Sequence, residues 1–486
     1  MLFNSYFFIF VFVPLSVTGY FALNRLTRPR YAGYFLLAMS LWFYGANDLR
    51  SLPVLLSSIV LNYLIGSSIL SSPYRRTKTA LLVCGILANL AALGVFKYLN
   101  FFLSNAAFLM GRSYDPIRLL LPLGISFFTF QQISYLVDAR RGDAPSYSLS
   151  EYALFASFFP YVTSGPIAFH SEILPQLRDE HKRKPSACNL SRGLTAFAFG
   201  LFKKVLVADT LGKAADWGWS NVAELNAPAA LVTILAYSLQ LYFDFAGYSD
   251  MASGVALCFN IELPVNFDSP YRARDIADFW KRWHITMTRF FTRYLYIPLG
   301  GSRRGLARTC LNTLLIFLLS GLWHGAAWTF ILWGALHGVA MVAARLIKAR
   351  TSRRLPFLPA WLLTFAFVNL CWVFFRAPTI AAGGQLLSRL ALGGWGALPE
   401  SLTGCFLTTE FSSLGQFIPL DSALFAAIVC VLFLLAALAG AVFPQNMQQR
   451  LLRFRPSVPL CLGSAALLFW SVLSLSGVST FLYFTF

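Results

Sequence analysis

One apolar stretch, NTLLIFLLSGLWHGAAWTFILWGALHG at residues 312–338, carries a histidine, His324, near its centre. Clusters of arginine and lysine lie on both sides of it, at 303–308 and at 345–354. Cytoplasmic loops of membrane proteins are enriched in these residues, so both ends of the stretch are expected on the cytoplasmic side. The whole apolar run, 311–344, has 34 residues, fewer than the roughly 40 that two complete crossings need. We therefore expect two half-depth helices that meet at GLWHG, with His324 roughly 20 Å along the helical rise from the cytoplasmic edge.

The composition of the chain is that of an integral membrane protein. Of its 486 residues, 57% are hydrophobic and 12% are charged, about half the charged share of an average soluble domain. At roughly 20 residues for each span, the apolar residues predict about ten to twelve transmembrane helices. Long unbroken apolar runs argue against a barrel of alternating strands, and the composition excludes a disordered, coiled-coil or disulfide-rich secreted protein.

The net charge of +19 comes from 39 basic and 20 acidic residues. The basic residues form short clusters between apolar runs, as the positive-inside rule describes, so the charge does not indicate nucleic-acid binding. Eight cysteines occur without CxxC or Cys/His spacing. They predict no metal site and read as small core residues.

The same basic clusters predict the path of the chain. Apolar segments occur at 5–24, 31–45, 53–71, 79–99, 117–137, 150–169, 193–208, 229–247, 311–344, 359–375, 422–443 and 457–477. The segment 150–169 is interrupted by Pro160 and by Gly165-Pro166, and basic loops flank it on both sides, so we expect a re-entrant hairpin there. Arginines follow the first run and none precedes it, which predicts an uncleaved anchor with its N-terminus outside. The region 376–421 is expected to be one long outer loop.

Five histidines are the main candidates for chemistry. An imidazole has an ordinary pKa of ~6.5, burial keeps it neutral and basic, and ionisable groups inside membranes are functional by default. His324 is therefore the first candidate for a general base; the alternative is a core histidine bonded to a carbonyl. His337 is expected to be structural, and His170 and His181 are expected to be solvated in or beside a charged loop.

His284 lies in the segment DIADFWKRWHITMTRFFTRYLYIPLGG, residues 275–301. A pair of aspartates resembling a capping box begins this segment and Pro298 ends it, which predicts one amphipathic helix. At about 100° per residue, one face carries Asp278, Arg282, Arg289 and Arg293, and the other Trp280, His284, Thr288 and Phe291. We expect the helix to lie on the cytoplasmic surface with its arginines among phosphates and His284 turned inward; the alternative is an interfacial anchor with a packed histidine.

Two further polar groups stand out. The stretch PLGGSRR at 298–304 combines paired glycines with Arg303 and Arg304, which suits phosphate, although ordinary positive-inside charge also explains it. Asp244 and Asp250 lie at the end of an apolar run and need partners, so we expect a structural polar network rather than catalysis. The sequence has no GxSxG, P-loop, HExxH or GxGxxG motif.

Together these segments resemble the membrane-bound O-acyltransferase (MBOAT) superfamily, in its bacterial alginate O-acetyltransferase branch. The resemblance is carried by LPLGISFFTFQQISYLVDARRGD at 121–143, LYFDFAGYSDMA at 241–252, NFDSPYRARDIADFWKRWHIT at 266–286, YLYIPLGGSRR at 294–304 and the 312–338 stretch. It runs from residue 1 to about 376 and resumes at the extreme C-terminus. It implies an all-α polytopic protein with one membrane-embedded domain over 1–486, built as a ring of tilted helices around a central tunnel. Its core motifs would lie in 121–376, and its C-terminal helices and tail in 422–486.

The resemblance also implies the roles of the site residues. The histidine of the WHG motif, here His324, would be catalytic, and the histidine that ends the WxRWH motif, here His284, would be the second functional residue; Lys281 and Arg282 stand between the two tryptophans. As general base, His324 would take the proton of a hydroxyl that attacks an acyl thioester. Acetyl-CoA is the expected donor, with no bound cofactor, and a phosphopantetheine carrier protein is the alternative. The expected donor-binding residues are Arg303, Arg304, Trp280, Arg282 and Trp323.

The expected setting is the bacterial inner (cytoplasmic) membrane, whose lipids surround the helices. There the acetyl group would pass to an extracytoplasmic (periplasmic) acetyltransferase partner and then to a polysaccharide: alginate, cellulose, peptidoglycan or another exopolymer. Two other classes are a transporter or flippase, which predicts internal symmetry that we do not find in the sequence, and a structural subunit of a polysaccharide synthase, in which His324 would be dispensable.

The C-terminal tail, FLYFTF at 481–486, is aromatic. Arginines precede the last apolar run, so the tail is expected outside, where a tyrosine is usually an interfacial anchor. The tail also resembles the tyrosine-bearing C-termini of polysaccharide acetyltransferase relatives, which implies that Tyr483 accepts the acyl group. A phenol with a pKa of ~10 would need His324 or His284 to take its proton.

Overall fold

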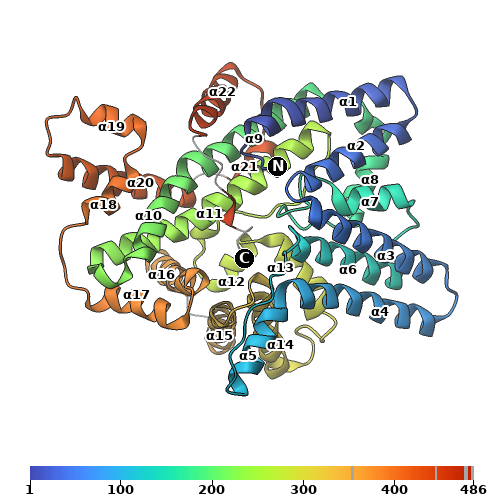
Figure 1. The fold of residues 1–486 in the computed structure, drawn as a ribbon, viewed down its shortest axis with the longest axis horizontal. Helices are drawn as coiled ribbons and strands as arrows, with labels where there is room; N and C mark the ends of the chain where they lie inside the picture. The colour runs from blue at the N-terminus through green and yellow to red at the C-terminus, as the bar shows by residue number, and fades with distance from the viewer. Residues whose placement is uncertain (352–354, 444–445, 476–479, 483–486) are drawn as a thin grey trace.

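The computed structural model of the chain describes residues 1–351, 355–443, 446–475 and 480–482. Helices joined by turns and loops make up this part of the chain, and no strand occurs in it (Figure 1). Eight helical stretches within it are long and apolar enough to cross a membrane: Phe8–Leu26, Leu49–Ser71, Arg75–Leu109, Ala227–Cys258, Gly305–His324, Trp328–Arg350, Phe357–Arg376 and Ser422–Val442. The protein is therefore an all-helical, multi-pass membrane protein.

Eight candidate spans are fewer than the ten to twelve that the apolar runs predict. Four of the runs form helices of only 16 or 17 residues, which are α2 (Pro29–Gly45), α6 (Ile125–Arg141), α9 (Ala187–Phe202) and α22 (Val458–Leu473). The run at 150–169 forms the short helix α7 (Leu149–Ser157) followed by buried turns, so it does not form a spanning helix, in agreement with the sequence. The region 376–421 is not one loop, because α17 (Ile380–Leu392) packs against α16 (Phe357–Arg376) there.

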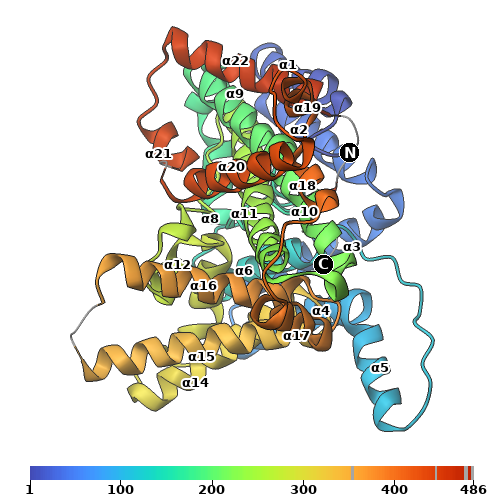
Figure 2. The same cartoon turned by 90° about the vertical axis from the view of Figure 1, so that its left-hand side faces the viewer.

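The centre of the molecule is α11 (Ala227–Cys258), a 32-residue helix that is buried along most of its length (Figures 1 and 2). Five helices pack around it: α9, α10 (Asp209–Ser220), α16, α17 and α20 (Ser422–Val442). Because α11 carries both Asp244 and Asp250, its burial brings carboxylates into the interior.

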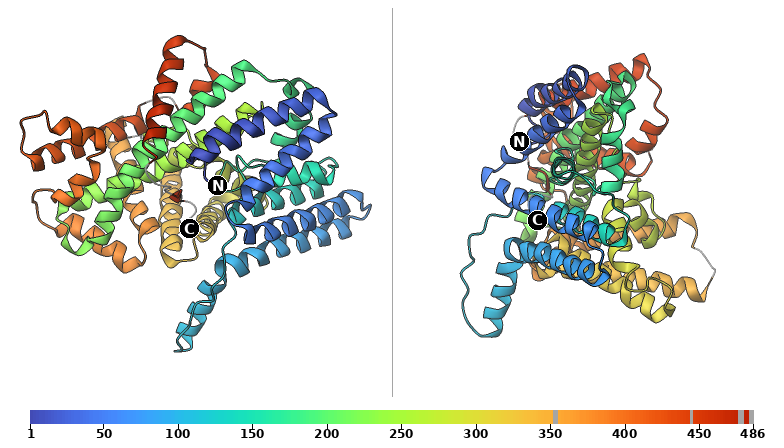
Figure 3. Two further views of the ribbon diagram at one scale, coloured as in Figure 1. Left: turned by 45° about the horizontal axis from the view of Figure 1, so that its top comes forward. Right: turned by 90° about the vertical axis from the view of Figure 1, so that its right-hand side faces the viewer.

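The other helices form two groups beside α11. The N-terminal group is α1 (Val13–Leu26), α2, α3 (Leu52–Ser71), α4 (Arg75–Leu93), α6, α7 and α8 (His170–Arg178), and α5 (Leu99–Leu109) projects from it (Figure 3). Four C-terminal helices lie on the opposite side: α17, α18 (Glu400–Thr403), α19 (Thr409–Gly415) and α20 (Figure 1). The last two helices, α21 (Met447–Leu452) and α22, pack against α9 instead. Between the two groups lie α12 (Ile276–Arg282), α13 (Ile285–Phe291), α14 (Gly305–His324), α15 (Trp328–Arg350) and α16 (Figure 1).

Glycines bring the backbones of α9 and α11 into direct contact. A Cβ at Gly200 would lie 2.6 Å from the carbonyl oxygen of Gly247, and a Cβ at Gly254 would lie 2.6 Å from that of Gly193. Small residues at such crossings let membrane helices approach closely. The two glycine contacts therefore fix the position of α9 against the central helix.

The hairpin of α14 and α15 differs in length from the prediction. The two helices have 20 and 23 residues, so each is longer than the predicted half-depth helices and long enough to cross a membrane. The helices continue into their basic flanks, with Arg308 inside α14 and Arg345 inside α15. His324 ends α14, about 28 Å along its axis from Gly305 at ~1.5 Å per residue. The hairpin is tight, because a Cβ on Gly321 would lie 2.3 Å from the carbonyl oxygen of Phe330.

The glycine contacts predict an unequal response to one added methyl group. Gly200→Ala and Gly247→Ala should lower the free energy of unfolding by about 1–3 kcal/mol, because the added Cβ meets backbone that cannot move aside locally. Gly463→Ala in α22 should be neutral or stabilising by up to about 1 kcal/mol, because nothing lies within 4 Å of its Cβ position. Thermal unfolding of the detergent-purified variants measures the difference, and equal melting temperatures would contradict the close crossing.

Candidate active site

His284 lies where the helix is interrupted, between α12 and α13. The predicted continuous helix is wrong here: α12 ends at Arg282, α13 begins at Ile285, and His284 has a left-handed backbone with φ of 44°. The preceding loop takes up the freed backbone groups, because Asp268 N donates to Arg282 O and Ile285 N donates to Asn266 O, both at 2.9 Å. The start of α12 agrees with the sequence, since the Asp275 side chain accepts from the backbone N–H of Asp278. A left-handed non-glycine residue held by its surroundings is typical of functional sites.

The same loop fixes the tautomer of His284. Its Nδ1 lies 2.9 Å from Asn266 Oδ1, which also accepts from Thr286 Oγ1 at 2.9 Å. Thr286 Oγ1 accepts from the backbone of Ile167, and Asn266 Nδ2 donates to Ser249 Oγ. The amide oxygen can only accept, so Nδ1 carries the proton and Nε2 the lone pair. Burial lowers the pKa of His284 to about 3, so the ring is neutral at physiological pH.

His324 lies next to His284, as the centroids of the two rings are 6.3 Å apart. Only 4% of His324 is exposed, and its ring packs edge-on against Trp333 at 5.2 Å and Phe375 at 5.2 Å. Trp323 contacts both histidines, at 4.9 Å from His324 and 6.0 Å from His284. The structure thus brings the two predicted catalytic residues together in one aromatic enclosure.

Lys97, which sequence analysis missed, holds the end of α14. Its Nζ donates to Trp323 O at 2.7 Å and His324 O at 3.0 Å, and to Ser126 Oγ at 3.3 Å. The neighbouring Tyr98 hydroxyl donates to Leu322 O at 2.9 Å. The last carbonyls of a helix lack partners within the helix and carry partial negative charge, so an ammonium group there stabilises the helix end. A lysine inside the apolar run 79–99 was the available sequence signal.

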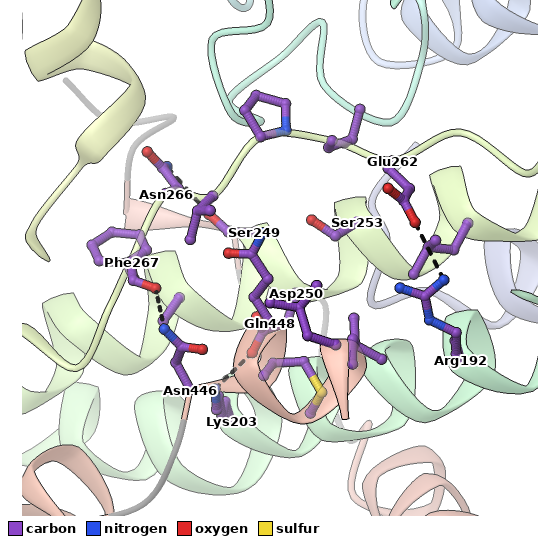
Figure 4. Close-up of a pocket in the computed structure, with 18 of the residues that line it drawn as sticks. Arg192, Lys203, Ser249, Asp250, Ser253, Glu262, Asn266, Phe267, Asn446 and Gln448 are labelled. Atoms are coloured by element: carbon purple, nitrogen blue, oxygen red, sulfur yellow. Dashed lines mark hydrogen bonds and ion pairs between the residues drawn. The ribbon is translucent and has the colours of Figure 1, made fainter. Parts of the chain in front are cut away.

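Two pockets approach the histidine pair. One is lined by His324, Trp323, Lys97, Thr163, Ser164 and residues 121–127. The other is lined by both charged and apolar residues and reaches Ser249 and Asn266, the residues behind His284 (Figure 4). In this second pocket Lys203 pairs with Asp250 at 2.6 Å and Arg192 pairs with Glu262 at 3.3 Å (Figure 4). The first pocket therefore reaches a histidine of the pair directly, and the second reaches only the residues that hold His284.

The five expected donor-binding residues are dispersed. Trp323 lines the pocket beside His324, whereas Trp280 is buried and donates to His337 Nδ1 at 3.3 Å. Arg282 pairs with Asp268 at 3.1 Å and Asp278 at 2.8 Å. Arg303 and Arg304 are exposed on the turn before α14. Geometry alone therefore joins only Trp323 to the histidine pair.

The remaining arginines of the predicted amphipathic face do not lie free among phosphates. Arg289 forms a two-pronged pair with Glu172 at 2.7 and 2.9 Å, and Arg293 bonds to Asp138 at 3.0 Å. The predicted stripe of arginines among phosphates is therefore corrected to a set of partly exposed arginine–carboxylate pairs. His284 does turn inward, as predicted, and is fully buried.

His170 is also buried, which contradicts the prediction that it is solvated. Tyr147 bonds its Nδ1 at 2.9 Å, and its Nε2 lies 3.3 Å from Asp138 Oδ2. Burial, the largest effect, would raise the pKa of Asp138, but hydrogen bonds from His170 and Tyr294 bring it below its ordinary value. His181 is exposed, and His337 is buried beside Trp280 as a packed residue, as expected. No cluster of three or more potential metal ligands occurs in the described part of the chain.

The two acidic residues of α11 belong to a polar network, as predicted; the pair of Asp244 is buried, and the pair of Asp250 is partly exposed. Asp250 pairs with Lys203, and Asp244 pairs with Lys204 at 2.6 Å. The partners are lysines of the π-helical turn Lys203–Ala208 after α9. Tyr483, the predicted acyl acceptor, lies outside the described residues.

Comparison of the sequence with known proteins identifies the family to which the chain belongs. The model of MBOAT, the membrane-bound O-acyltransferase family, matches residues 77–381. The chain is 43% identical over 419 residues to the peptidoglycan O-acetyltransferase of Helicobacter pylori, covering 80% of each protein. It is 35% identical over 435 residues to a probable alginate O-acetylase of Pseudomonas aeruginosa, covering 86% of this chain and 82% of that protein. A teichoic acid D-alanyltransferase of Bacillus subtilis is 27% identical over 278 residues, covering 54% of this chain and 70% of that protein.

The fold and the buried histidine pair thus belong to a multi-pass membrane acyltransferase. The chain is a member of the membrane-bound O-acyltransferase family.

Lys97 should act on turnover through the position of His324. Lys97→Met removes the donors that hold the last carbonyls of α14, and the resulting displacement of His324 should lower kcat by about 10–100-fold with KM for the acyl donor unchanged. Lys97→Arg should retain part of the rate, because a guanidinium also donates to carbonyls. Steady-state kinetics on purified protein test this, with the exposed Lys348→Met as control. A raised KM with unchanged kcat would contradict the positioning role.

Proposed function

We propose that the protein transfers acetyl groups from cytoplasmic acetyl-CoA through the bacterial inner membrane, for O-acetylation of a polysaccharide outside it by an extracytoplasmic partner acetyltransferase. The observation that carries the proposal is the pair of buried histidines with ring centroids 6.3 Å apart. The acetyl chemistry and the polysaccharide class are supported by the names of the peptidoglycan and alginate relatives.

In the proposed reaction His324 is the general base. It takes the proton of an acceptor hydroxyl as that oxygen forms a bond to the thioester carbon; the carbon–sulfur bond then breaks, and the thiolate of coenzyme A leaves and takes up a proton. His284 lies close enough to assist, because its ring centroid is 6.3 Å from that of His324. Its basic nitrogen is Nε2, since Nδ1 is bonded to Asn266. General-base catalysis of this kind contributes typically about 10²–10⁴-fold to the rate.

The proposed donor site uses positive charge. Arg303 and Arg304 are exposed beside Gly300 and Gly301, whose left-handed backbones shape the turn before α14. Guanidinium groups suit the phosphates of coenzyme A, and Trp323 lines the pocket that contains His324. Under this proposal the arginines bind the nucleotide end, and the thioester reaches the histidine pair.

We further propose that Tyr483 carries the acetyl group between donor and partner. The phenol would gain the acetyl group as an ester and lose its proton to one of the two histidines. Leu482, the residue before it, is held in the interior by a hydrogen bond from its N–H to Asp244 Oδ2 at 3.0 Å. This contact supports the proposal, because it places the backbone of Leu482, next to Tyr483 in sequence, against a buried carboxylate of α11.

His324→Ala should abolish acetylation with the protein still folded in the membrane, a loss of about 10²–10⁴-fold, because the base is removed. Purified protein with radiolabelled acetyl-CoA measures turnover, and retention of label on peptidoglycan or alginate fragments measures transfer. His284→Ala should weaken the reaction, and the exposed His181→Ala should leave it unchanged. Wild-type turnover by His324→Ala would refute the assignment.

Tyr483→Phe should abolish relay while leaving donor binding intact. After incubation with acetyl-CoA, mass spectrometry should find one added acetyl group on the C-terminal peptide of the wild type and none in Tyr483→Phe. Full polysaccharide acetylation in cells that carry Tyr483→Phe would rule out the relay and favour an interfacial anchor.

A further inference from the structure

The ammonium group of Lys204 has more partners than an ordinary ion pair. Lys204 is 2% exposed, and its Nζ lies 2.6 Å from Asp244 Oδ1 and 2.9 Å from Asp209 Oδ1. The third contact is to the C-terminal segment, since Nζ donates to Thr480 O at 3.1 Å. An ammonium group has three protons, so the three contacts together use all its donors.

The two carboxylate oxygens of Asp244 also have different partners. Oδ1 accepts from Lys204, and Oδ2 accepts from the backbone N–H of Leu482 at 3.0 Å. The ion pair therefore binds the segment 480–482 at both of its backbone ends, a carbonyl by the cation and an N–H by the anion. Without the segment, both a buried ammonium donor and a buried carboxylate acceptor would lose a partner, which is costly in a low-dielectric interior.

Phe481, between these two backbone contacts, fills an aromatic position. It is 1% exposed, and Lys204 Nζ lies 4.7 Å from the centre of its ring. The ring packs edge-on against Tyr248 at 4.6 Å. A desolvated cation over an aromatic face adds to the attraction, so the position selects an aromatic side chain.

The neighbouring ion pair shows that charge pairing alone does not require the segment. Lys203 comes from the same π-helical turn as Lys204, and Asp250 comes from α11. The two groups lie 2.6 Å apart and line the pocket of Figure 4. Their described hydrogen bonds are to each other rather than to residues 480–482. The two adjacent lysines each pair with an aspartate of α11, and of the two only Lys204 has a described contact with the C-terminal segment.

Tyr248 connects the bound segment to the catalytic pocket. Its hydroxyl lies 2.5 Å from Thr163 Oγ1, and Thr163 lines the pocket that contains His324. The contact path from Phe481 to that pocket therefore passes through one tyrosine and one threonine.

We propose that Lys204 and Asp244 are positioning residues that form a docking site for the protein's own C-terminal segment. The site recognises the aromatic ring of Phe481 and the backbone groups on either side of it. Docking holds residues 480–482 beside the pocket of His324 and so sets where the following residues of the tail can reach. The second part of this proposal rests on the proposed acetyl transfer; the docking itself does not.

Hydrogen–deuterium exchange on the full-length protein in detergent tests the docking. Lys204→Met/Asp244→Leu replaces the pair by apolar side chains of similar size, so neither member of the pair is left as an unpaired buried charge. Asp209, the other carboxylate beside Lys204, is partly exposed to solvent. We expect exchange in the C-terminal peptide to be at least about tenfold faster than in the wild type. The matched variant Lys203→Met/Asp250→Leu should leave that peptide as protected as in the wild type. Equal exchange in the wild type and Lys204→Met/Asp244→Leu would overturn the docking site, as would equal acceleration by both variants.

Variants in the segment keep the test independent of the core substitutions. Phe481→Ala removes the ring and should accelerate exchange in the peptide, and Phe481→Tyr keeps an aromatic ring and should restore part of the protection. Protection that is unchanged in Phe481→Ala would contradict recognition of the ring.

Acetyl transfer measured on the same samples separates the two levels of the proposal. If the segment is released and acetyl transfer falls at least about tenfold with unchanged KM for acetyl-CoA, the positioning role is supported. If the segment is released and kcat is unchanged, the docking site stands and its role in the reaction is refuted. If the wild type itself does not acetylate, the proposed function fails, and exchange still decides the docking site.

Discussion

The architecture depends on the direct backbone contact between α9 and α11. Gly200 lies against Gly247, and the two lysines that follow in the next turn meet Asp244 and Asp250 on the other helix. A larger residue at the crossing would move the ammonium groups away from their carboxylates. The close approach of the helices and the pairing of charges therefore depend on each other. The 32-residue helix α11 carries two aspartates that need partners, and the small residues at the crossing let the lysines reach them.

The histidine site depends on elements far from it in sequence. The loop at 266–268 satisfies the broken helix around His284, and Lys97 satisfies the end of the helix that carries His324. Each histidine is thus held by a backbone irregularity whose polar groups find partners in another element. Rigid support of this kind keeps reactive groups within the small tolerance that catalysis needs.

The sequence predicts which ionisable residues lie in apolar runs. It does not predict the features that depend on contacts between distant parts of the chain. His324, the inward turn of His284 and the need of Asp244 and Asp250 for partners followed from polar groups in apolar runs. The helix break at His284 did not, because helical periodicity continues through it and the compensating bonds come from residues 266–268. His170 was misjudged because its partner Asp138 lies 32 residues away.

Both ends of the chain meet on one side chain. The ring of Phe3 stacks on Tyr248 at 4.9 Å, and Phe481 meets the same ring at 4.6 Å. During synthesis the first helices enter the membrane long before the last residues leave the ribosome, and domains generally form from the N-terminal side. The interior around Tyr248 can be completed only after Phe481 has been added and has left the ribosome. A polypeptide that stops before Phe481 would insert its helices yet lack this contact, so its interior around Tyr248 would stay incomplete.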